Sequence, residues 1–354
     1  MTRMTLPALA LALVSCGSNG TPSPIVVLDP TTEVVTSELI GHPDAPHEPG
    51  RNLLWCATLE LAWRAAVERL GDPLILENDP ALAECLNRGD FSLADLDDAS
   101  FVAQAGLGRE RILETIREEL SAKFGDRGTQ TLLPARVRDI DLLVYAYLRK
   151  SLPFAEPFLA TDPIDFNGTP VDAFGLRHEA GATEHWLRIA KQVSVLDHLS
   201  DDDFLVELMT ESPGDRLVLA RVAPGPTLES TIDAVMARIV AAEPSVFRQI
   251  DRLVVPKIDF DLTQSFPELE GLRVLNEGST EFSVAKVQQR IAFSLDERGA
   301  ELESEAAMLI FGAAALTPRH FVFDGPFLLL LTREGADRPY LALWIETPDL
   351  LVPA

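Results

Sequence analysis

The sequence predicts an α+β fold, because helical patterns come early in the chain and strand patterns come late. Apolar residues at spacings of three and four indicate helices in the first part. Short apolar or alternating runs, bounded by turn residues, indicate strands in the last part. Helices and strands that are segregated along a chain are typical of α+β proteins rather than of doubly wound parallel sheets.

The helical segments are supported by periodicity and by residues that begin or end helices. Ile112, Ile116 and Leu120 share one face of the clearest segment, and Gly125 can end it. Pro80 suits the first turn of an earlier helix. The predicted helices are 52–70, 79–88, 109–124 and 228–242.

Apolar runs of strand length recur from residue 141 onward. Pro213 and Gly214 form a turn between two of these runs, which are therefore predicted to pair as a hairpin. The polar segment 333–339 links the last two runs in the same way. The predicted strands are 141–147, 204–209, 216–222, 252–255, 286–295, 327–332 and 340–345.

The N-terminus has the composition of an export signal. Arg3 precedes the apolar run 6–14, which is too short to span a bilayer as a helix. The run leads to Cys16 in a pattern that resembles a bacterial lipobox, so we expect a lipid anchor on Cys16 and a membrane-anchored lipoprotein at the periplasmic or cell-surface (extracellular) side. A plain secretory peptide and an accidental apolar terminus are the alternatives. The predicted divisions are a signal peptide over 1–15, a flexible tether over 16–50 and a folded domain over 51–354.

The charge balance excludes several classes of partner. The chain has 30 Lys and Arg residues against 55 Asp and Glu residues, a formal net charge of −25. A surface this acidic repels phosphate backbones and anionic lipid headgroups, which argues against nucleic-acid binding and electrostatic membrane docking. In an oxidising compartment Cys56 and Cys85 can form a disulfide, but Cys56 lies in an apolar stretch that also suits a buried free thiol, so both states stay open.

The sequence lacks the common motifs of catalysis and metal binding. There is no phosphate-binding loop, no dinucleotide-binding glycine motif, no paired-histidine protease motif and no serine nucleophile motif. The six histidines do not cluster at metal spacing, and the closest pair, His42 and His47, lies in a Pro-rich segment. The acidic run 201–203 lacks the glycine and glutamate of a calcium loop and is predicted to be a solvated turn. We therefore expect no enzymatic activity, no cofactor and no metal.

The last hundred residues resemble the serpin family in an ordered set of motifs. The motifs are VVPKIDF at 254–260, IAFSLDERGAE at 291–301, FVFDGPFLL at 321–329 and LALWIETP at 341–348. Weaker matches at 52–57, similar to the start of a serpin helix, and at 142–158 extend the resemblance over 51–354. The resemblance implies helices packed on large mixed or antiparallel sheets, an exposed reactive loop, and inhibition of serine or cysteine proteases. We expect a monomer.

The resemblance also implies a hinge, which in serpins inserts into the main sheet after a protease cleaves the loop. Insertion needs small or apolar side chains at alternate positions, because successive strand residues point to opposite faces. Residues Ala300, Leu302, Ser304 and Ala306 would face the core, and Glu301, Glu303 and Glu305 the solvent, although Leu302 is bulkier than this face favours. The predicted hinge comprises Glu297, Gly299, Ala300, Glu301, Leu302, Glu303 and Ser304.

The family's usual spacing from Glu297 places the scissile bond at Ala313–Ala314, with neighbours through Leu316 as alternatives. Small residues at this bond imply a target protease with a small S1 pocket. The segment 301–311 also contains strong helix formers, so a loop that rests as a helix is the competing local prediction.

Three of the positions that depart from the family pattern belong to one polar cluster. The polar Ser, Asn and His cluster that controls sheet opening in serpins falls at Leu59, Val144 and Gln289. Apolar replacements can preserve the fold, because a polar network removed completely leaves nothing unsatisfied. The sequence therefore leaves two functions open: a protease inhibitor that inserts its loop, and a non-inhibitory serpin-fold lipoprotein with a binding or structural role.

Overall fold

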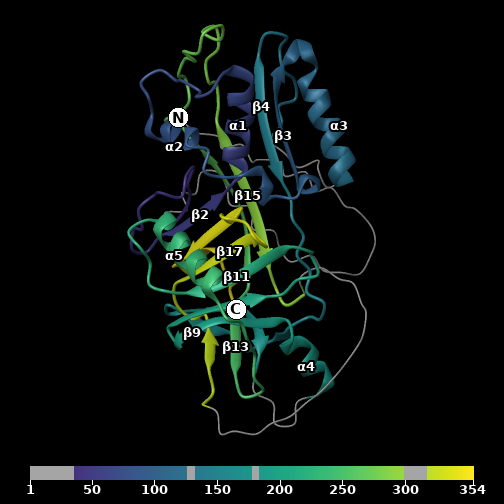
Figure 1. Cartoon of the computed structure of the whole chain (residues 1–354), viewed down its shortest axis with the longest axis vertical. Coiled ribbons are helices and arrows are strands. Elements are labelled where there is room, and N and C mark those ends of the chain that lie inside the picture. The colour runs from purple at the N-terminus through teal and green to yellow at the C-terminus, as the bar shows by residue number, and fades with distance from the viewer. Residues whose placement is uncertain (1–35, 126–131, 178–182, 299–316) are drawn as a thin grey trace, which may run out of the picture.

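The computed structural model describes residues 36–125, 132–177, 183–298 and 317–354, and every structural statement below concerns these ranges (Figure 1). They contain five α-helices, none of which is long and apolar enough to cross a membrane. The helices are α1 (Thr58–Leu70), α2 (Ala81–Asn87), α3 (Ile112–Phe124), α4 (Glu184–Ala190) and α5 (Leu228–Ala241). Short 3₁₀ turns lie at Leu93–Asp95, Asp98–Ser100, Gly108–Glu110 and Pro348–Leu350.

An eight-stranded sheet forms the centre of the molecule. Its strands, in spatial order, are β1 (Ser37–Leu39), β2 (Asn52–Cys56), β18 (Leu341–Ile345), β17 (Phe327–Arg333), β11 (Asp215–Arg221), β10 (Asp203–Leu208), β9 (Val193–Ser200) and β12 (Ser245–Val246). Strands β1 and β2 are parallel, and the other neighbours are antiparallel. Leu329 and Leu343 pair across the β17–β18 hairpin and are fully buried. Strands covered on both faces require the continuous apolar runs seen in this hairpin.

A four-stranded sheet lies beside this centre. Its order is β16 (His320–Val322), β13 (Arg252–Pro256), β8 (Ala173–Leu176) and β5 (Leu159–Ala160). Strand β16 runs parallel to β13, with His320 opposite Arg252, and β8 runs antiparallel to β13. A separate hairpin joins β6 (Ile164–Phe166) to β7 (Thr169–Val171).

Two further sheets have two strands each within the described residues. One joins β3 (Phe101–Leu107) to β4 (Leu142–Leu148), and the other joins β14 (Ile258–Ser265) to β15 (Gln288–Leu295). Side chains of β4 alternate between two clusters. Val144 packs with the α1 cluster and Tyr145 with the α3 cluster, so the β3–β4 sheet is covered by a helix on each face.

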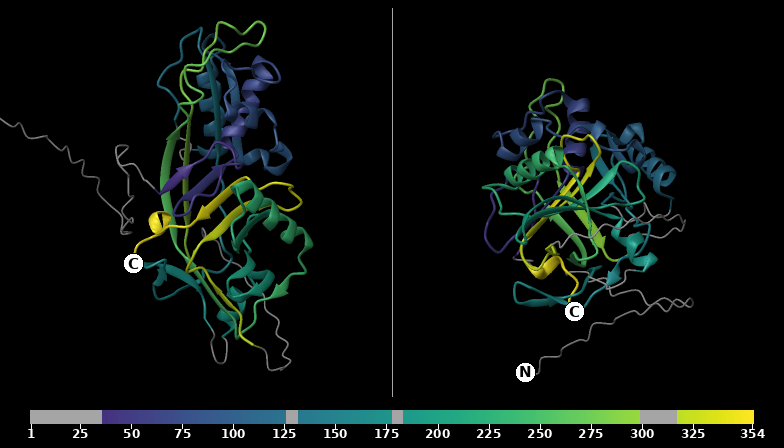
Figure 2. Two further views of the ribbon diagram at one scale, coloured as in Figure 1. Left: turned by 90° about the vertical axis from the view of Figure 1, so that its left-hand side faces the viewer. Right: turned by 60° about the horizontal axis from the view of Figure 1, so that its bottom comes forward.

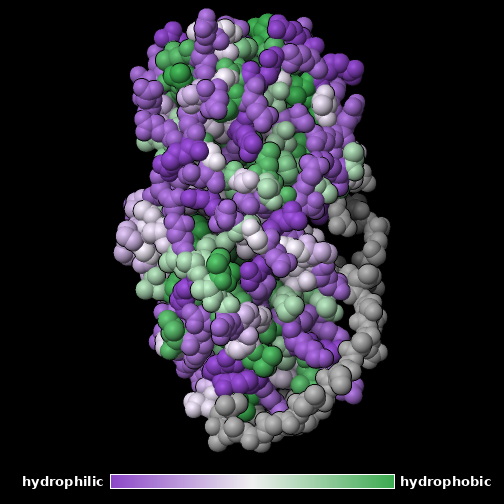
Figure 3. Space-filling view, in the orientation of Figure 1, coloured by the Kyte–Doolittle hydropathy of each residue, from purple (hydrophilic) through white to green (hydrophobic). Residues whose placement is uncertain are grey.

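The molecule is elongated, with α1, α2, α3 and the β3–β4 sheet at one end and β9, β13 and α4 at the other (Figure 1). Strands β14 and β15 run along the long axis and connect the two ends, which a turned view makes clear (Figure 2). The face seen in Figure 3 is mostly hydrophilic, with small apolar patches. This surface agrees with the strongly negative net charge of the chain.

Most predicted elements are confirmed. The hairpin around Pro213 and Gly214 forms between β10 and β11, with Val206 opposite Leu219. The hairpin of the last two predicted strands forms between β17 and β18. The helices predicted over 79–88 and 228–242 appear as α2 and α5, and the predicted α+β class is correct.

The single helix predicted over 52–70 is wrong. Its first five residues, Asn52–Cys56, form strand β2, and the helix begins only at Thr58. All five residues are buried between β1 and β18. A fully buried strand has the same apolar composition as a buried helix, so periodicity could not separate the two. The weaker motif match at 52–57 therefore covers a strand and not the start of a helix.

The start of the helix predicted over 109–124 is also different. Residues Gly108–Glu110 form a 3₁₀ turn, and Arg111 adopts a left-handed backbone conformation, with φ 61°, before α3 begins. At the other end Gly125 caps the helix as predicted.

The tether predicted over 16–50 is too long. Residues 37–39 form β1 at the edge of the eight-stranded sheet, and Leu39 and Ile40 are buried. These residues pair with Asn52–Leu54 of β2, so the folded part begins before residue 51. The surrounding Pro, Gly and His residues concealed a strand this short.

Candidate functional site

The candidate site is the segment that follows β15. Glu297, near the end of the described range 183–298, is held in place by its neighbours. Lys257 Nζ lies 2.8 Å from Glu297 Oε2, and both side chains are about one-fifth exposed. The backbone N–H of Phe158 donates to the Glu297 carbonyl at 2.7 Å. Burial would raise the pKa of the Glu297 carboxyl, but Lys257 outweighs this effect and holds the pKa below its usual value. The side chain and the backbone of Glu297, the predicted hinge residue, are therefore both held by specific contacts.

The other end of the same segment is anchored more strongly. Asp251 is fully buried and accepts from Arg319 Nη2 at 2.6 Å and from Arg248 Nη2 at 2.8 Å. Arg248 also donates to the carbonyl of Thr317 at 2.9 Å. Burial would raise the pKa of Asp251, but the two guanidinium groups outweigh it and lower the pKa. A charge this deeply buried is stable only because it is paired on every side.

Residues 299–316 thus connect two anchored positions that belong to different sheets. The residues before the segment follow β15 of a two-stranded sheet, and the residues after it lead into β16 of the four-stranded sheet. The predicted residues Gly299, Ala300, Glu301, Leu302, Glu303, Ser304, Ala313 and Ala314 all lie outside the described residues, as does Cys16.

Residues of β4 and the residue before β15 pack against one cluster under α1. Val144 of β4 and Val287, directly before β15, pack against the same buried cluster as Leu59 of α1. Tyr147 of β4 contributes to the electrostatic environment of Arg290 of β15. Within the described residues, however, β4 is hydrogen-bonded only to β3, and β15 only to β14.

A polar contact ties β15 to the start of α1. Gln289 is 4% exposed, and its Nε2 donates to Thr58 Oγ1 at 2.7 Å and to the Cys56 carbonyl at 2.9 Å. Its Oε1 is buried without a hydrogen-bond partner in the described part of the chain. A buried acceptor without a hydrogen bond lowers the stability of the folded state by roughly 1–3 kcal/mol. The Gln289 contact therefore leaves part of its hydrogen-bonding capacity unused.

The structure therefore gathers Leu59, Val144 and Gln289 at one place, as the sequence comparison implied, and adds a residue that it missed. Thr58 supplies a hydroxyl directly beside the leucine that replaces the family serine. The only sequence signal was its position, one residue before Leu59. Amide and hydroxyl chemistry is thus retained by shifted residues, although the imidazole is lost.

Two other sequence questions are answered within the described residues. Cys56 and Cys85 are both free thiols, so the alternative disulfide does not form. The acidic run after β9 is engaged by arginines: Arg238 binds Asp203 at 2.7 Å, and Arg221 binds Asp202 at 2.8 Å. Asp201 and Asp202 form a turn, as predicted, whereas Asp203 begins β10, and carboxylates of the run are ion-paired as well as solvated.

These features define an α+β protein in which a connecting segment, anchored at both ends, follows a strand of a two-stranded sheet and leads into a four-stranded sheet. The fold is that of a serpin, as the C-terminal motifs implied. The solved structure of serpin-12 of Manduca sexta, a serine protease inhibitor, has a TM-score of 0.51 and 13% sequence identity. The alignment covers 87% of this chain and 95% of that one.

Two further solved structures are similar at lower scores. Serpin48 of the insect Tenebrio molitor has a TM-score of 0.46 and 13% identity, with 84% of this chain and 92% of that chain covered. Human thyroxine-binding globulin complexed with thyroxine has a TM-score of 0.46, 12% identity and the same coverage. No family model matches the sequence, and no curated protein matches it. At these identities the likeness shows the fold alone.

Proposed function

We propose that the protein inhibits serine or cysteine proteases by presenting residues 299–316 as bait and inserting the cleaved segment between β15 and β4. The observation that carries the proposal is the incomplete pairing of these strands. Residues of β4 and the residue before β15 pack against the same cluster under α1, yet within the described residues each strand has only one hydrogen-bonded strand neighbour. The bait follows β15 in the chain, so it would turn back after Glu297 to form the new strand.

The covalent step is ordinary acyl transfer that stops halfway. The protease nucleophile attacks the carbonyl carbon of Ala313, the bond to the nitrogen of Ala314 breaks, and the protease base passes the nucleophile's proton to that nitrogen. The product is an ester or thioester between the protease and Ala313. Insertion of the upstream residues then pulls the attached protease away from its substrate-bound geometry before water can hydrolyse the acyl bond.

The alternation of the hinge supports insertion over simple cleavage. In an inserted strand of the kind the resemblance implies, Ala300, Leu302, Ser304 and Ala306 would share the face that meets the core. Three of these four side chains are small, and Leu302 is the bulky exception. The glutamates between them would meet solvent, where their mutual repulsion is weak.

The test is incubation of the protein with an elastase-like protease, followed by denaturing electrophoresis. We expect a covalent complex that survives denaturation and contains one copy of each protein. Ala306→Arg places a charge on the inserted face and should convert the inhibitor into a cleaved substrate. Its neighbour Glu305→Arg is the matched control, because its side chain would face solvent, and it should still form the complex. Cleavage of the wild type with full retention of protease activity would sink the proposal.

The non-inhibitory alternative also has a specific observation in its favour. The orphaned Oε1 of Gln289 and the missing imidazole alter the contact that ties β15 to α1. If that contact holds β15 too firmly, the segment would be cleaved without insertion. The protein would then serve as a binding or structural lipoprotein, and wild type and Ala306→Arg would behave alike in the protease experiment.

We further propose that the protein is exported and anchored by a lipid on Cys16. The apolar run 6–14 and the small residues before Cys16 support this. Palmitate labelling that is lost in Cys16→Ser, together with accumulation of the precursor in globomycin, is the expected result. Cys56→Ser is the control and should still be labelled. An unlabelled wild-type protein would remove the anchor.

A further inference from the structure

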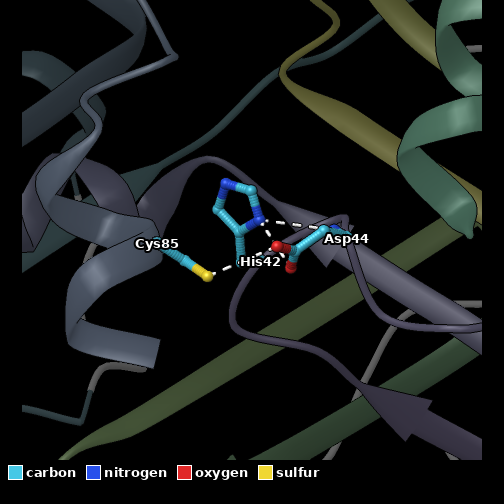
Figure 4. A group of neighbouring side chains, drawn as sticks. All are labelled: His42, Asp44 and Cys85. Atoms are coloured by element: carbon cyan, nitrogen blue, oxygen red, sulfur yellow. Dashed lines mark hydrogen bonds and ion pairs between the residues drawn. The ribbon is translucent and has the colours of Figure 1, made fainter. Parts of the chain in front are cut away.

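A mixed group of side chains lies away from the reactive segment, between α2 and the loop that follows β1. His42 and Asp44 come from the loop, and Cys85 comes from α2 (Figure 4). His42 Nδ1 is 2.9 Å from Asp44 Oδ1, and Cys85 Sγ is 3.4 Å from Asp44 Oδ2. One potential ligand atom from each residue lies within 4.8 Å of the other two.

The histidine is held in a fixed orientation. His42 is 4% exposed, and its Nδ1 lies 2.9 Å from Asp44 Oδ1 and 3.3 Å from the backbone nitrogen of Asp44. Its Nε2 faces Asp90 Oδ2 at 3.7 Å. The ring therefore lies between two carboxylates, an arrangement that favours a cation nearby.

Arg88 supplies a cation there at present. Its Nη2 lies 3.0 Å from Asp44 Oδ2 and 3.2 Å from His42 Nδ1. The side chain is 45% exposed, and its Nε also binds Asp90 at 3.2 Å. Arg88 can therefore release Asp44 into solvent and still keep an ionic partner.

We propose that His42 Nδ1, the Asp44 carboxylate and Cys85 Sγ form a binding site for Zn²⁺ or a similar borderline transition-metal ion, with water as the fourth ligand. One imidazole, one carboxylate and one thiolate are a donor set that Zn²⁺ accepts, whereas Ca²⁺ and Mg²⁺ prefer oxygen alone. The Asp90 carboxylate behind Nε2 is the outer partner that metal-bound histidines commonly have.

The distances fit such an ion with small movements. In a tetrahedral zinc site, neighbouring ligand atoms lie about 3.3–3.5 Å apart, given the usual bond lengths. The Cys85–Asp44 distance already has this value, and the His42–Asp44 distance needs to open by about 0.4 Å. The His42 and Cys85 ligand atoms lie within 4.8 Å of each other, and rotation of the Cys85 side chain on α2 can bring them closer.

Binding is an exchange of cations with a balanced proton count. Zn²⁺ replaces the Arg88 guanidinium at Asp44, and the Cys85 thiol gives its proton to the buffer as the Zn–S bond forms. Burial and the neighbouring Asp44 raise the pKa of this thiol, so the metal must drive the deprotonation. The Asp44 carboxyl has a pKa of about 2, because Arg88 and His42 outweigh the opposing effect of burial, so it is already ionised. The bound ion would clip the loop after β1 to α2.

The experiment is titration of the reduced full chain with Co²⁺ and then Zn²⁺. We expect one equivalent of Co²⁺ to give a thiolate-to-cobalt absorption band that Zn²⁺ abolishes, and Zn²⁺ to raise the melting temperature. Cys85→Ser should lose the band, while Cys56→Ser and Cys16→Ser should keep it. Asp90→Asn should weaken binding by about 10–100-fold, as loss of an outer partner does.

Arg88→Ala separates a metal site from a purely structural cluster and does not depend on the folding of Cys85→Ser. Loss of the competing guanidinium should tighten Co²⁺ binding, whereas a cluster built around Arg88 would bind no better without it. A band that persists in Cys85→Ser, or an Arg88→Ala variant that binds no more tightly than wild type, overturns the proposal.

Discussion

Glu60 illustrates how one buried side chain sets a property of the whole fold. It lies in the first turn of α1 and is 8% exposed. Burial raises the pKa of its carboxyl to about 7, with Asp90 adding to the rise and Arg338 and Arg88 opposing it. The nearby buried thiol of Cys56 stays protonated, because burial raises its pKa as well. The charge of Glu60 therefore changes near neutral pH.

The sign of the pH dependence follows from this shift. In the unfolded chain Glu60 has its ordinary pKa of 4.5, so between that value and about 7 the folded state binds more protons. The free energy of unfolding should thus fall as pH rises through this window, by about 3 kcal/mol at most, and then level off. Glu60→Gln should remove this part of the dependence and be more stable than wild type at pH 8. Urea denaturation at pH 5 and pH 8 measures it; an identical slope in both proteins would contradict the assignment.

Residue-scale chemistry was the part that the sequence predicted least. The Thr58–Gln289 contact joins residues 231 positions apart, and the Asp44–Cys85 contact joins residues 41 positions apart. Family alignment could place Gln289 but not its partner, because the hydroxyl has moved by one residue. The metal motifs that a sequence reveals have fixed short spacings, and only the pair at 42 and 44 has one.

At the scale of elements, β16 depends on a buried ion group. Arg319 directly precedes β16 and binds Asp251, which is fully buried before β13. Arg319→Ala leaves the Asp251 charge with only Arg248 and should lower the free energy of unfolding by about 3 kcal/mol, the usual cost of breaking a buried pair. Chemical denaturation gives the value.

The matched control is Arg273→Ala, whose ion pair with Glu77 lies at the surface. Solvent screens such pairs, so this variant should keep nearly the stability of wild type. If the two variants lose the same free energy of unfolding, burial of Asp251 does not strengthen the contribution of its ion pair with Arg319.

Element prediction succeeded where local chemistry and tertiary position agreed. The β10–β11 and β17–β18 hairpins combine apolar runs with clear turn residues, and both form. Prediction failed for β2, because complete burial removes the alternation that distinguishes a strand. It also missed β3, whose residues FVAQAGL include small and polar side chains at positions that face the two covering helices. Tertiary packing, which the sequence does not display, selected the strand at both sites.

At the scale of the whole molecule, the long-range order of motifs predicted what local patterns could not. Four C-terminal motifs identified the fold, although the strands in two of them pair with strands distant in sequence. Strand β17 pairs with β11, and β18 pairs with β2. Glu297, which the motif assigns to the hinge, follows β15 closely and binds Lys257. The incomplete pairing of β4 and β15 could not be read from the sequence, because both strands have ordinary composition. Only the assembled sheets reveal that each has a single hydrogen-bonded neighbour within the described ranges.

That arrangement predicts how cleavage changes global stability. A strand inserted between β15 and β4 would form a hydrogen-bond ladder on each side, about ten bonds that each contribute roughly 1 kcal/mol net. Cleavage within 299–316 should therefore raise the melting temperature by roughly 10 °C or more, even though the chain has been cut. Calorimetry of intact and cleaved protein measures the change, and hydrogen exchange should slow in β4 and β15 together.

Ala306→Arg supplies the control for this prediction, because cleavage occurs but the charged side chain blocks insertion. Cleaved Ala306→Arg should melt at or below the temperature of its intact form, as expected when a loop is simply cut. If the cleaved wild type behaves in the same way, the two sheets do not accept a strand. The buried Gln289 Oε1 without a partner would then belong to a serpin fold that no longer inserts its loop, and not to one ready for insertion.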